Sequence, residues 1–353
     1  MKSNDSESIS LLGKWLKSEN ASSPISKRLG TITRKFFGLS SREYRKALTG
    51  LRDKIGIVET YMTQQKWDEI NYSHVPSYAM KLYTNSFSEH DPERFSQYLS
   101  DVASGKKKIN ASTLYPYDIV RDVMKGDNNP TRMESLNCQW NALPNYLEGV
   151  DDVRALVLAD VSGSMTSADG NVRPIDVAIS LAIYFAERMK GPFGGYFMTF
   201  TSEPSLVKIE GNTIQKKVRS VERSEWGYNT NLIAAFQTIL NSTVSNRVPS
   251  DQMPEKLFII SDMQFDEACD NNDKTNFEMI DRMYKEAGYK RPTLVFWNVN
   301  AKSDSPVTKD DMGSFMVSGC SPSILKYAMN TKAMTAIDLM LEVLNSERYS
   351  FIY

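Results

Sequence analysis

Asp160, Ser162 and Ser164 place three oxygen-bearing side chains directly after the uncharged apolar run Ala155–Ala159. Such a run predicts a buried strand in the middle of a parallel sheet. Because side chains alternate along an extended chain, the three residues should lie on one side of the turn that follows the strand. Hydroxyl and carboxylate oxygens are the ligands that Mg²⁺ and Mn²⁺ prefer. The segment therefore predicts a divalent-metal site at the carboxyl end of a strand, with Asp160 on its solvent-facing side.

Two later segments could complete the site. Thr230 is the last residue of a glycine-containing loop that begins at Trp226, and an apolar helix is expected directly after it. Asp262 directly follows a second apolar strand, expected at residues 257–261. The alternative is an ordinary strand-to-helix turn in which Ser164 caps the next helix. The order of the three pieces, each at a strand end or a helix start, favours the metal site.

The elements that must position these residues alternate between strand and helix from residue 153 onward. This order predicts an α/β fold with a mostly parallel sheet and helices on both faces. Ligands of such sheets bind beyond the carboxyl ends of the strands, where Asp160 and Asp262 stand. Besides the two strands above, we expect strands at 195–200, 206–209, 293–299 and 315–317, and helices at 175–190, 231–240, 277–287 and 323–344.

The first 150 residues predict an all-helical region. Apolar residues recur at helical spacing from Ser41 to Met62, and further helices are expected at 76–87, 91–100 and 115–124. We therefore divide the chain into a poorly ordered lead-in at 1–26, a helical domain at 27–150 and an α/β domain at 151–353.

Residues 27–54 are strongly basic, with nine Lys or Arg. One interpretation is a solvated helix face, and the other is a phosphate-binding surface for RNA. The cations that could form such a surface are Arg42, Arg45 and Lys46, helped by Lys106, Lys107 and Lys108 if these three lysines fold nearby.

The overall composition argues against several classes of protein. The 353 residues carry 42 Lys or Arg and 43 Asp or Glu, so no net field points to nucleic acid or membrane. We expect neither a signal peptide nor a membrane span, and the three dispersed cysteines fit a reducing cytoplasmic setting. His74 and His90 are the only histidines, and neither lies in a nucleophile arrangement, so we expect no enzyme of the triad type.

The series D-V-S-G-S at 160–164, Thr230 and Asp262 resembles the metal-ion-dependent adhesion site of von Willebrand factor A domains, which are Rossmann-like. The resemblance implies that Asp160, Ser162, Ser164, Thr230 and Asp262 hold Mg²⁺ or Mn²⁺. It also implies that an acidic side chain of a protein partner takes the open position on the metal. Trp226, Tyr228 and Gln264 would then form the rim that contacts this partner.

Further segments resemble the DUF2828 family. They are W-D-E-I-N-Y-S-H-V-P-S-Y-A-M (67–80), H-D-P-E-R-F-S-Q-Y-L (90–99), K-I-N-A-S-T-L-Y-P-Y-D-I-V (108–120), S-D-M-Q-F-D-E-A (261–268) and M-V-S-G-C-S-P-S-I-L-K (316–326). The layout is more loosely similar to the Ro60/TROVE proteins, which bind RNA through helical repeats.

Three functions follow as hypotheses. The first is a non-enzymatic interaction protein whose metal site grips an acidic residue. The second is a Ro60-like RNA-binding protein that uses the basic helical domain. The third is a metal-dependent hydrolase, which is the weakest hypothesis because the sequence offers one metal position, no histidine base and no Gly-rich lysine loop for phosphate. Asp266 or Glu267 would act as its base, but we expect these two residues to form the rim of the site or to cap a helix.

Overall fold

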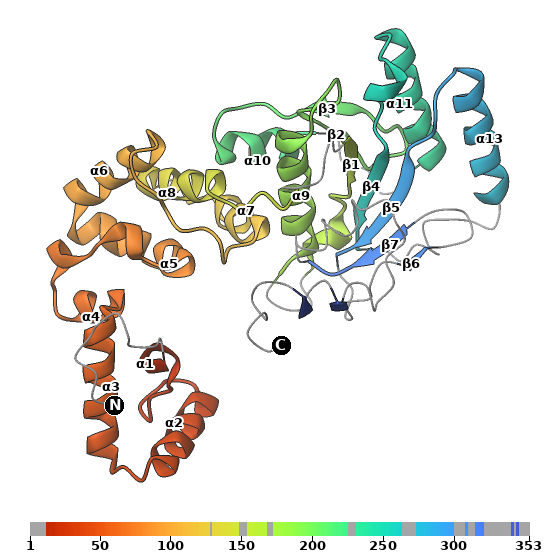
Figure 1. Ribbon diagram of the computed structural model, residues 1–353. Coiled ribbons are helices and arrows are strands. Elements are labelled where there is room, and N and C mark those ends of the chain that lie inside the picture. Colours follow the sequence, from red (N-terminus) through yellow and green to blue (C-terminus); the bar gives the residue numbers. More distant parts are fainter. Residues whose placement is uncertain are drawn as a thin grey trace. The chain divides into compact units, whose positions relative to one another are not determined.

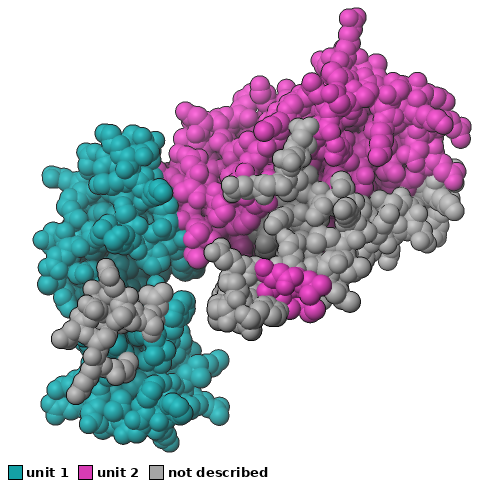
Figure 2. Space-filling model, viewed as in Figure 1, with its two compact units in different colours: residues 1–110 teal, residues 111–353 magenta. Residues whose placement is uncertain are grey.

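The computed structural model describes residues 12–127, 129–147, 154–167, 172–224, 231–262, 273–299, 308–309, 315–320, 340–341 and 344–345. The chain forms two compact units, residues 1–110 and residues 111–353 (Figure 2). Among the described residues, none of the helices combines the length and the hydropathy that crossing a bilayer requires.

Unit 1 is helical, which confirms the prediction for the N-terminal region. The predicted helices at 76–87 and 91–100 are present as α5 and α6, whereas α2 was not predicted. The helices are α1 (Leu12–Trp15), α2 (Pro24–Phe36), α3 (Ser41–Ile55), α4 (Val58–Thr63), α5 (Ser77–His90) and α6 (Pro92–Ala103), with short 3₁₀ turns at Trp67–Glu69 and Tyr72–His74.

The helix predicted from Ser41 to Met62 is broken at Gly56. A capping box starts α3: Ser40 accepts a hydrogen bond from the Glu43 backbone, and the Glu43 carboxylate accepts one from the Ser40 backbone. Gly56 has a φ of +64°, the left-handed conformation that ends helices and that glycine adopts without strain. The next helix, α4, begins at Val58. The helical spacing of apolar residues continues across the turn between the two helices, so this spacing alone does not reveal the break.

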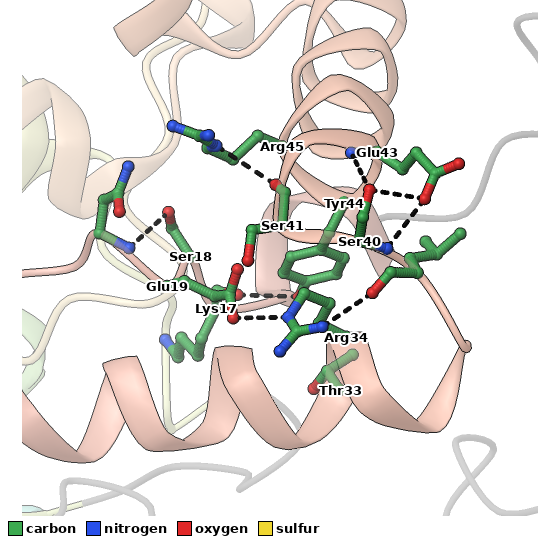
Figure 3. A network of polar contacts seen from close by, with 12 residues as sticks. Lys17, Ser18, Glu19, Thr33, Arg34, Ser40, Ser41, Glu43, Tyr44 and Arg45 are labelled. Carbon is green, nitrogen blue, oxygen red and sulfur yellow. Dashed lines mark hydrogen bonds and ion pairs between the residues drawn. The ribbon is translucent and has the colours of Figure 1, made fainter.

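Residues 12–23, within the lead-in predicted to be poorly ordered, are held by specific polar contacts (Figure 3). The Tyr44 hydroxyl donates to the Lys17 carbonyl at 2.8 Å, and Arg34 Nε donates to Glu19 Oε1 at 2.7 Å. The Arg34 hydrogen bond also lowers the pKa of Glu19 below its ordinary value. This segment is therefore part of the fold of unit 1, although its composition is that of a loop.

Unit 2 contains a seven-stranded sheet in the order β3-β2-β1-β4-β5-β7-β6 (Figure 1). The pairs from β2 to β7 are parallel, whereas the two outermost strands, β3 and β6, run antiparallel to their neighbours. The strands are β1 (Ala155–Ala159), β2 (Tyr196–Thr199), β3 (Leu206–Lys208), β4 (Lys256–Ser261), β5 (Thr293–Asn298), β6 (Thr308–Lys309) and β7 (Phe315–Ser318).

Helices cover both faces of this sheet, as the alternation of elements predicted (Figure 1). Ala155, Val157 and Ala159 of β1 belong to one core with α9 (Pro174–Arg188) and α10 (Ile214–Glu222). Leu156 and Leu158 belong to the other core, with α11 (Leu232–Ser245) and α13 (Asp273–Glu286). Consecutive residues of β1 are thus buried on opposite faces, which explains its unbroken apolar sequence.

Two helices before residue 150 pack with the sheet unit rather than with unit 1. They are α7 (Pro116–Met124), which was predicted, and α8 (Pro130–Asn141), which was not. Trp140 Nε1 donates to Glu187 Oε2 at 2.9 Å, and the Asn137 side chain accepts from the Ile214 backbone at 3.0 Å. The contacts therefore divide the chain after residue 110, forty residues before the boundary expected from composition. The helix expected at 323–344 lies largely outside the described residues.

Candidate metal centre

Asp160 follows β1 at the carboxyl edge of the sheet and is fully buried. Its backbone N–H donates to the Ile260 carbonyl at 2.9 Å, so it continues the ladder between β1 and β4. Its Oδ2 accepts from Ser261 Oγ at 2.6 Å, and its Oδ1 accepts from the Ser162 N–H at 2.8 Å. The expectation that this residue faces solvent is wrong, because the extra ladder bond draws it into the sheet. The carboxylate instead fixes the start of the following turn.

The hydroxyls of Ser162 and Ser164 lie together beyond Asp160. Their Oγ atoms are 3.0 Å apart, and Ser164 Oγ donates to Asp262 Oδ1 at 3.2 Å. Ser164 is exposed within the 3₁₀ turn η4 (Gly163–Thr166), while its neighbour Met165 is fully buried. Burial of Met165 anchors the turn and leaves Ser164 facing outward. Ser164 is thus not the cap of the next helix, which begins at Pro174.

Strand pairing explains why residues almost a hundred positions apart meet here. β1 and β4 are parallel neighbours, with Ala159 opposite Ile260, so both strands end at the same edge. Asp262 stands one residue beyond β4 and is partly exposed. The structure therefore brings together four of the five predicted metal ligands: Asp160, Ser162, Ser164 and Asp262.

The remaining predicted site residues, Thr230, Trp226, Tyr228 and Gln264, lie outside the described residues, as do Asp266 and Glu267. The residue after Thr230 is described. Asn231 caps α11 through a 3.0 Å bond from the Ala234 N–H, and its own N–H donates to the Thr201 carbonyl at 3.4 Å. Since Thr201 lies just past β2, α11 starts at the same edge of the sheet.

The oxygen donors at this edge are of the type that suits a hard divalent cation. The described atoms are two serine hydroxyls and the carboxylates of Asp160 and Asp262, and Mg²⁺ binds sites with only one or two protein carboxylates. Within the described parts of the chain, no group of three or more His, Cys, Asp or Glu side chains could hold a metal. A metal here would therefore need the hydroxyls as well as the acids.

Two groups that support the site are not indicated by the sequence alone. Ser261 holds Asp160 in place, although nothing distinguished it from the other residues of β4. At the start of α9, which lies against η4, Arg173 Nε donates to Asp176 Oδ2 at 3.0 Å. This hydrogen bond raises the pKa of Arg173 above its ordinary value. Asp176 is completely buried and engaged by Arg173, so it adds no open carboxylate to the site.

The candidate RNA-binding cations do not share one surface. Arg42, Arg45 and Lys46 lie in the first part of α3, whereas the three lysines at 106–108 follow α6. Figure 1 shows α6 and the first turn of α3 at opposite ends of unit 1. All six side chains are exposed, and Lys107 pairs with Asp101 at 3.0 Å. The three lysines therefore do not add to a surface formed by the cations of α3.

Comparisons with known proteins divide the chain in two. Residues 154–348 match the model of DUF7788, a domain of unknown function, and this match covers more than half of the chain. The chain belongs to the DUF7788 family. Residues 1–150 match DUF2828, another domain of unknown function, which confirms that resemblance for the helical half. The C-terminal segments that also resembled DUF2828 fall within the DUF7788 match instead.

Two individual proteins are similar to this chain. It is 31% identical over 358 residues to the uncharacterized protein L728 of Acanthamoeba polyphaga mimivirus; this alignment covers 95% of this chain and 60% of L728. The chain thus spans about three fifths of the length of that relative. The crystal structure of the Deinococcus radiodurans RO (RSR) protein superimposes with a TM-score of 0.40 and 13% identity, covering 92% of this chain and 74% of that one.

Proposed function

We propose that unit 2 is a von Willebrand factor A-like domain whose metal-ion-dependent adhesion site binds a protein partner. The observation that carries the proposal is the continuous chain of oxygens from Ser162 to Ser164 to Asp262, with contacts of 3.0 and 3.2 Å at the carboxyl edge of the sheet. Together with Thr230 and Asp160, these residues would hold Mg²⁺ or Mn²⁺.

Asp160 would act mainly through position. Its two carboxylate oxygens accept from Ser261 Oγ and the Ser162 N–H, so it orients the turn that presents the hydroxyls. Groups that hold metal ligands in this way commonly set metal affinity as strongly as the ligands themselves.

The charge balance at the site supports an acidic partner. Asp160 and Asp262 together neutralise a divalent ion, and the nearby Asp176 is engaged by Arg173. A neutral ion–site pair still accepts one further anionic oxygen, which a site with three or four open carboxylates would reject. The metal, when bound, would supply the positive charge that attracts an Asp or Glu side chain of the partner, with Trp226, Tyr228 and Gln264 as the proposed rim.

We propose a binding role rather than an enzymatic one. Both histidines of the sequence, His74 and His90, lie in unit 1, so unit 2 has no histidine that could serve as a general base. The RNA-binding alternative rests on the basic residues of 27–54 alone, because Lys106, Lys107 and Lys108 follow α6, which lies at the opposite end of unit 1 from the first turn of α3.

Metal titration by calorimetry tests the site. We expect Ser164→Ala and Asp262→Asn each to weaken Mn²⁺ binding by about tenfold or more, because the first removes a hydroxyl ligand and the second removes a negative charge from the site. Ser245→Ala and Asp251→Asn are matched controls, since both residues are exposed elsewhere in unit 2, and both should bind Mn²⁺ like the unmodified protein. Equal affinity in all four variants would exclude the site.

Partner capture from host lysate tests the function. Capture should be lost with EDTA and with Ser164→Ala, and should survive RNase. If capture survives EDTA, the metal has only a structural role. If RNase abolishes capture, the RNA-binding alternative becomes the better explanation.

A further inference from the structure

A basic cleft lies between strand β3 and helix α10, the two elements that follow each other at the outer edge of the sheet. Its volume is about 720 Å³, and all of its lining residues are described. Its lining includes Leu206, Val207, Lys208, Lys216, Arg219 and Arg223.

The cleft runs along the open edge of the sheet. Among the strands that the structure describes, β3 is the last on its side of the sheet. Leu206 packs against one of the two cores, and Val207 packs against the other. Residues that point to opposite faces of a sheet can line the same cleft only if that cleft follows the strand edge.

The backbone of β3 offers hydrogen bonds toward this edge. The Thr199 N–H donates to the Ser205 carbonyl, and the Ile209 N–H donates to the Gly195 carbonyl. In an antiparallel pair the bonding direction alternates, so Ser205, Val207 and Ile209 bond inward to β2. The N–H and C=O groups of Leu206 and Lys208 therefore point outward, as a template for another strand.

Four exposed cations surround this edge: Lys208, Lys216, Arg219 and Arg223. In the described part of the chain, none of them has a carboxylate oxygen within the 4.0 Å of an ion pair, whereas the adjacent Lys217 pairs with Glu187. Glu210 is the one acidic residue of the lining. The described lining thus carries four cations against one carboxylate, and Glu222, outside the lining, interacts electrostatically with Arg219.

The helix presents its cations as a row. Lys216 and Arg219 of α10 and Arg223, the C-cap that follows it, are separated by three and four positions, so they lie on one face and extend over about 10 Å. Alternate side chains of an extended peptide are about 7 Å apart, so two acidic residues of such a peptide would fall within reach of this row.

A close backbone approach holds the two walls together. Gly211 has a φ of +108°, and a Cβ at this position would clash with Cβ of Lys216. The Glu210 N–H donates to Ser220 Oγ at 3.0 Å. The turn between β3 and α10 is therefore tight, and the cleft is a built feature of the fold.

We propose that this cleft binds an extended acidic peptide segment of a protein partner, which adds to β3 as a further strand and places its carboxylates against α10. Strand addition combines main-chain hydrogen bonds with side-chain selection, which the open edge and the cation row supply. A single-stranded nucleic acid fits less well, since the residues described in the lining include no aromatic ring on which a base could stack. The site contains none of the candidate metal ligands, so it acts independently of the metal centre.

Fluorescence anisotropy with a short labelled peptide of alternating Glu and Thr tests the proposal, at about 50 mM salt and in the presence of EDTA. The full chain should bind this peptide, and binding should weaken by about tenfold for a peptide with Gln in place of Glu. The same peptide N-methylated along one edge should also bind about tenfold more weakly, because it cannot complete the ladder.

Charge reversal locates the binding. Lys216→Glu combined with Arg219→Glu should weaken peptide binding by about tenfold or more. Lys285→Glu combined with Lys290→Glu is the matched control, since both lysines are exposed elsewhere in unit 2, and it should bind normally. Circular dichroism establishes that both variants are folded.

Three outcomes would overturn the proposal: no peptide binding, equal binding by the N-methylated peptide, or tighter binding of an oligouridine that depends on Lys216 and Arg219. The last would assign the cleft to nucleic acid. Because EDTA is present throughout, failure here leaves the metal-site proposal untouched.

Discussion

The sheet of unit 2 and helix α2 of unit 1 place their apolar residues in opposite ways. Every residue of β1 and β4 is buried, and the helices on both faces complete two cores. In α2, by contrast, Ile25, Ile32 and Phe36 are 73%, 54% and 83% exposed. With Leu29 they recur at positions i, i+4, i+7 and i+11, which makes one continuous apolar stripe on the surface.

The face of α2 that packs against the rest of unit 1 carries a small residue, Gly30, and a polar residue, Arg34. Gly30 is the buried residue of this helix, and a Cβ there would lie 2.7 Å from the Lys17 carbonyl oxygen. Arg34, one turn further, bonds to Glu19 and to the Leu39 carbonyl. Close backbone approach and hydrogen bonds thus hold α2, whereas hydrophobic burial holds the sheet. An amphipathic pattern therefore identifies a helix without telling which face the protein buries.

The largest expected effect is in the sheet. Phe258 of β4 is fully buried, with its ring 4.9 Å from that of Phe185 and 6.5 Å from that of Trp297. Phe258→Ala should lower the free energy of unfolding of unit 2 by about 3–5 kcal/mol, because it leaves a cavity that the strands cannot close. Urea denaturation followed by circular dichroism measures this. A loss below about 1 kcal/mol would contradict the contrast drawn between the two regions.

A charge buried in the sheet should make the free energy of unfolding depend on pH, with an effect of intermediate size. Lys256 at the start of β4 is 4% exposed, and burial lowers its pKa from 10.5 to about 8, partly opposed by Glu255. Between these two pKa values the unfolded chain binds more protons than the folded one, so stability rises with pH. We expect a gain on the order of 1 kcal/mol between about pH 7.5 and pH 9.

Lys256→Met is the control for this titration. It should remove that rise and stabilise the protein near neutral pH, since no charge is then buried. Denaturation curves of both proteins at the two pH values measure the difference. Burial raises the pKa of the Cys138 thiol from 9.0 to about 11, which lowers stability at higher pH, so the comparison stays below about pH 9. An equal rise in the variant would assign the effect to other groups.

Much of the fold could be predicted because single strong patterns specify it. The apolar run 155–159 and the helix-start signals before α5, α6 and α7 each gave the right element. α10 was missed because only Ile214, Val218 and Val221 mark its buried face, too few to establish a period in nine residues. The antiparallel direction of β3 depends on pairing with β2, which local sequence does not encode.

The meeting of Ser164 with Asp262 could be predicted, because parallel strands end at one edge of a sheet. The burial of Asp160 could not, since it depends on one ladder bond to Ile260. The support from Ser261 depends on the register of β1 against β4, which is a tertiary property.

The smallest expected effect is on the exposed stripe of α2. Phe36→Ser should change the free energy of unfolding by no more than about 0.5 kcal/mol, because an 83% exposed ring loses few contacts. Phe87→Ser in the same unit is the matched control. Its ring is fully buried, 5.2 Å from that of Tyr72, so it should cost about 3 kcal/mol or more.

Denaturation of both variants at two protein concentrations shows whether the apolar stripe of α2 is exposed, covered by the chain itself or covered by a second copy of the chain. If Phe36→Ser is as destabilising as Phe87→Ser at both concentrations, the chain itself covers the stripe, and the contrast between α2 and the sheet fails. If it destabilises only at the higher concentration, a second copy of the chain covers the stripe, because only an association that buries Phe36 makes its contribution depend on concentration.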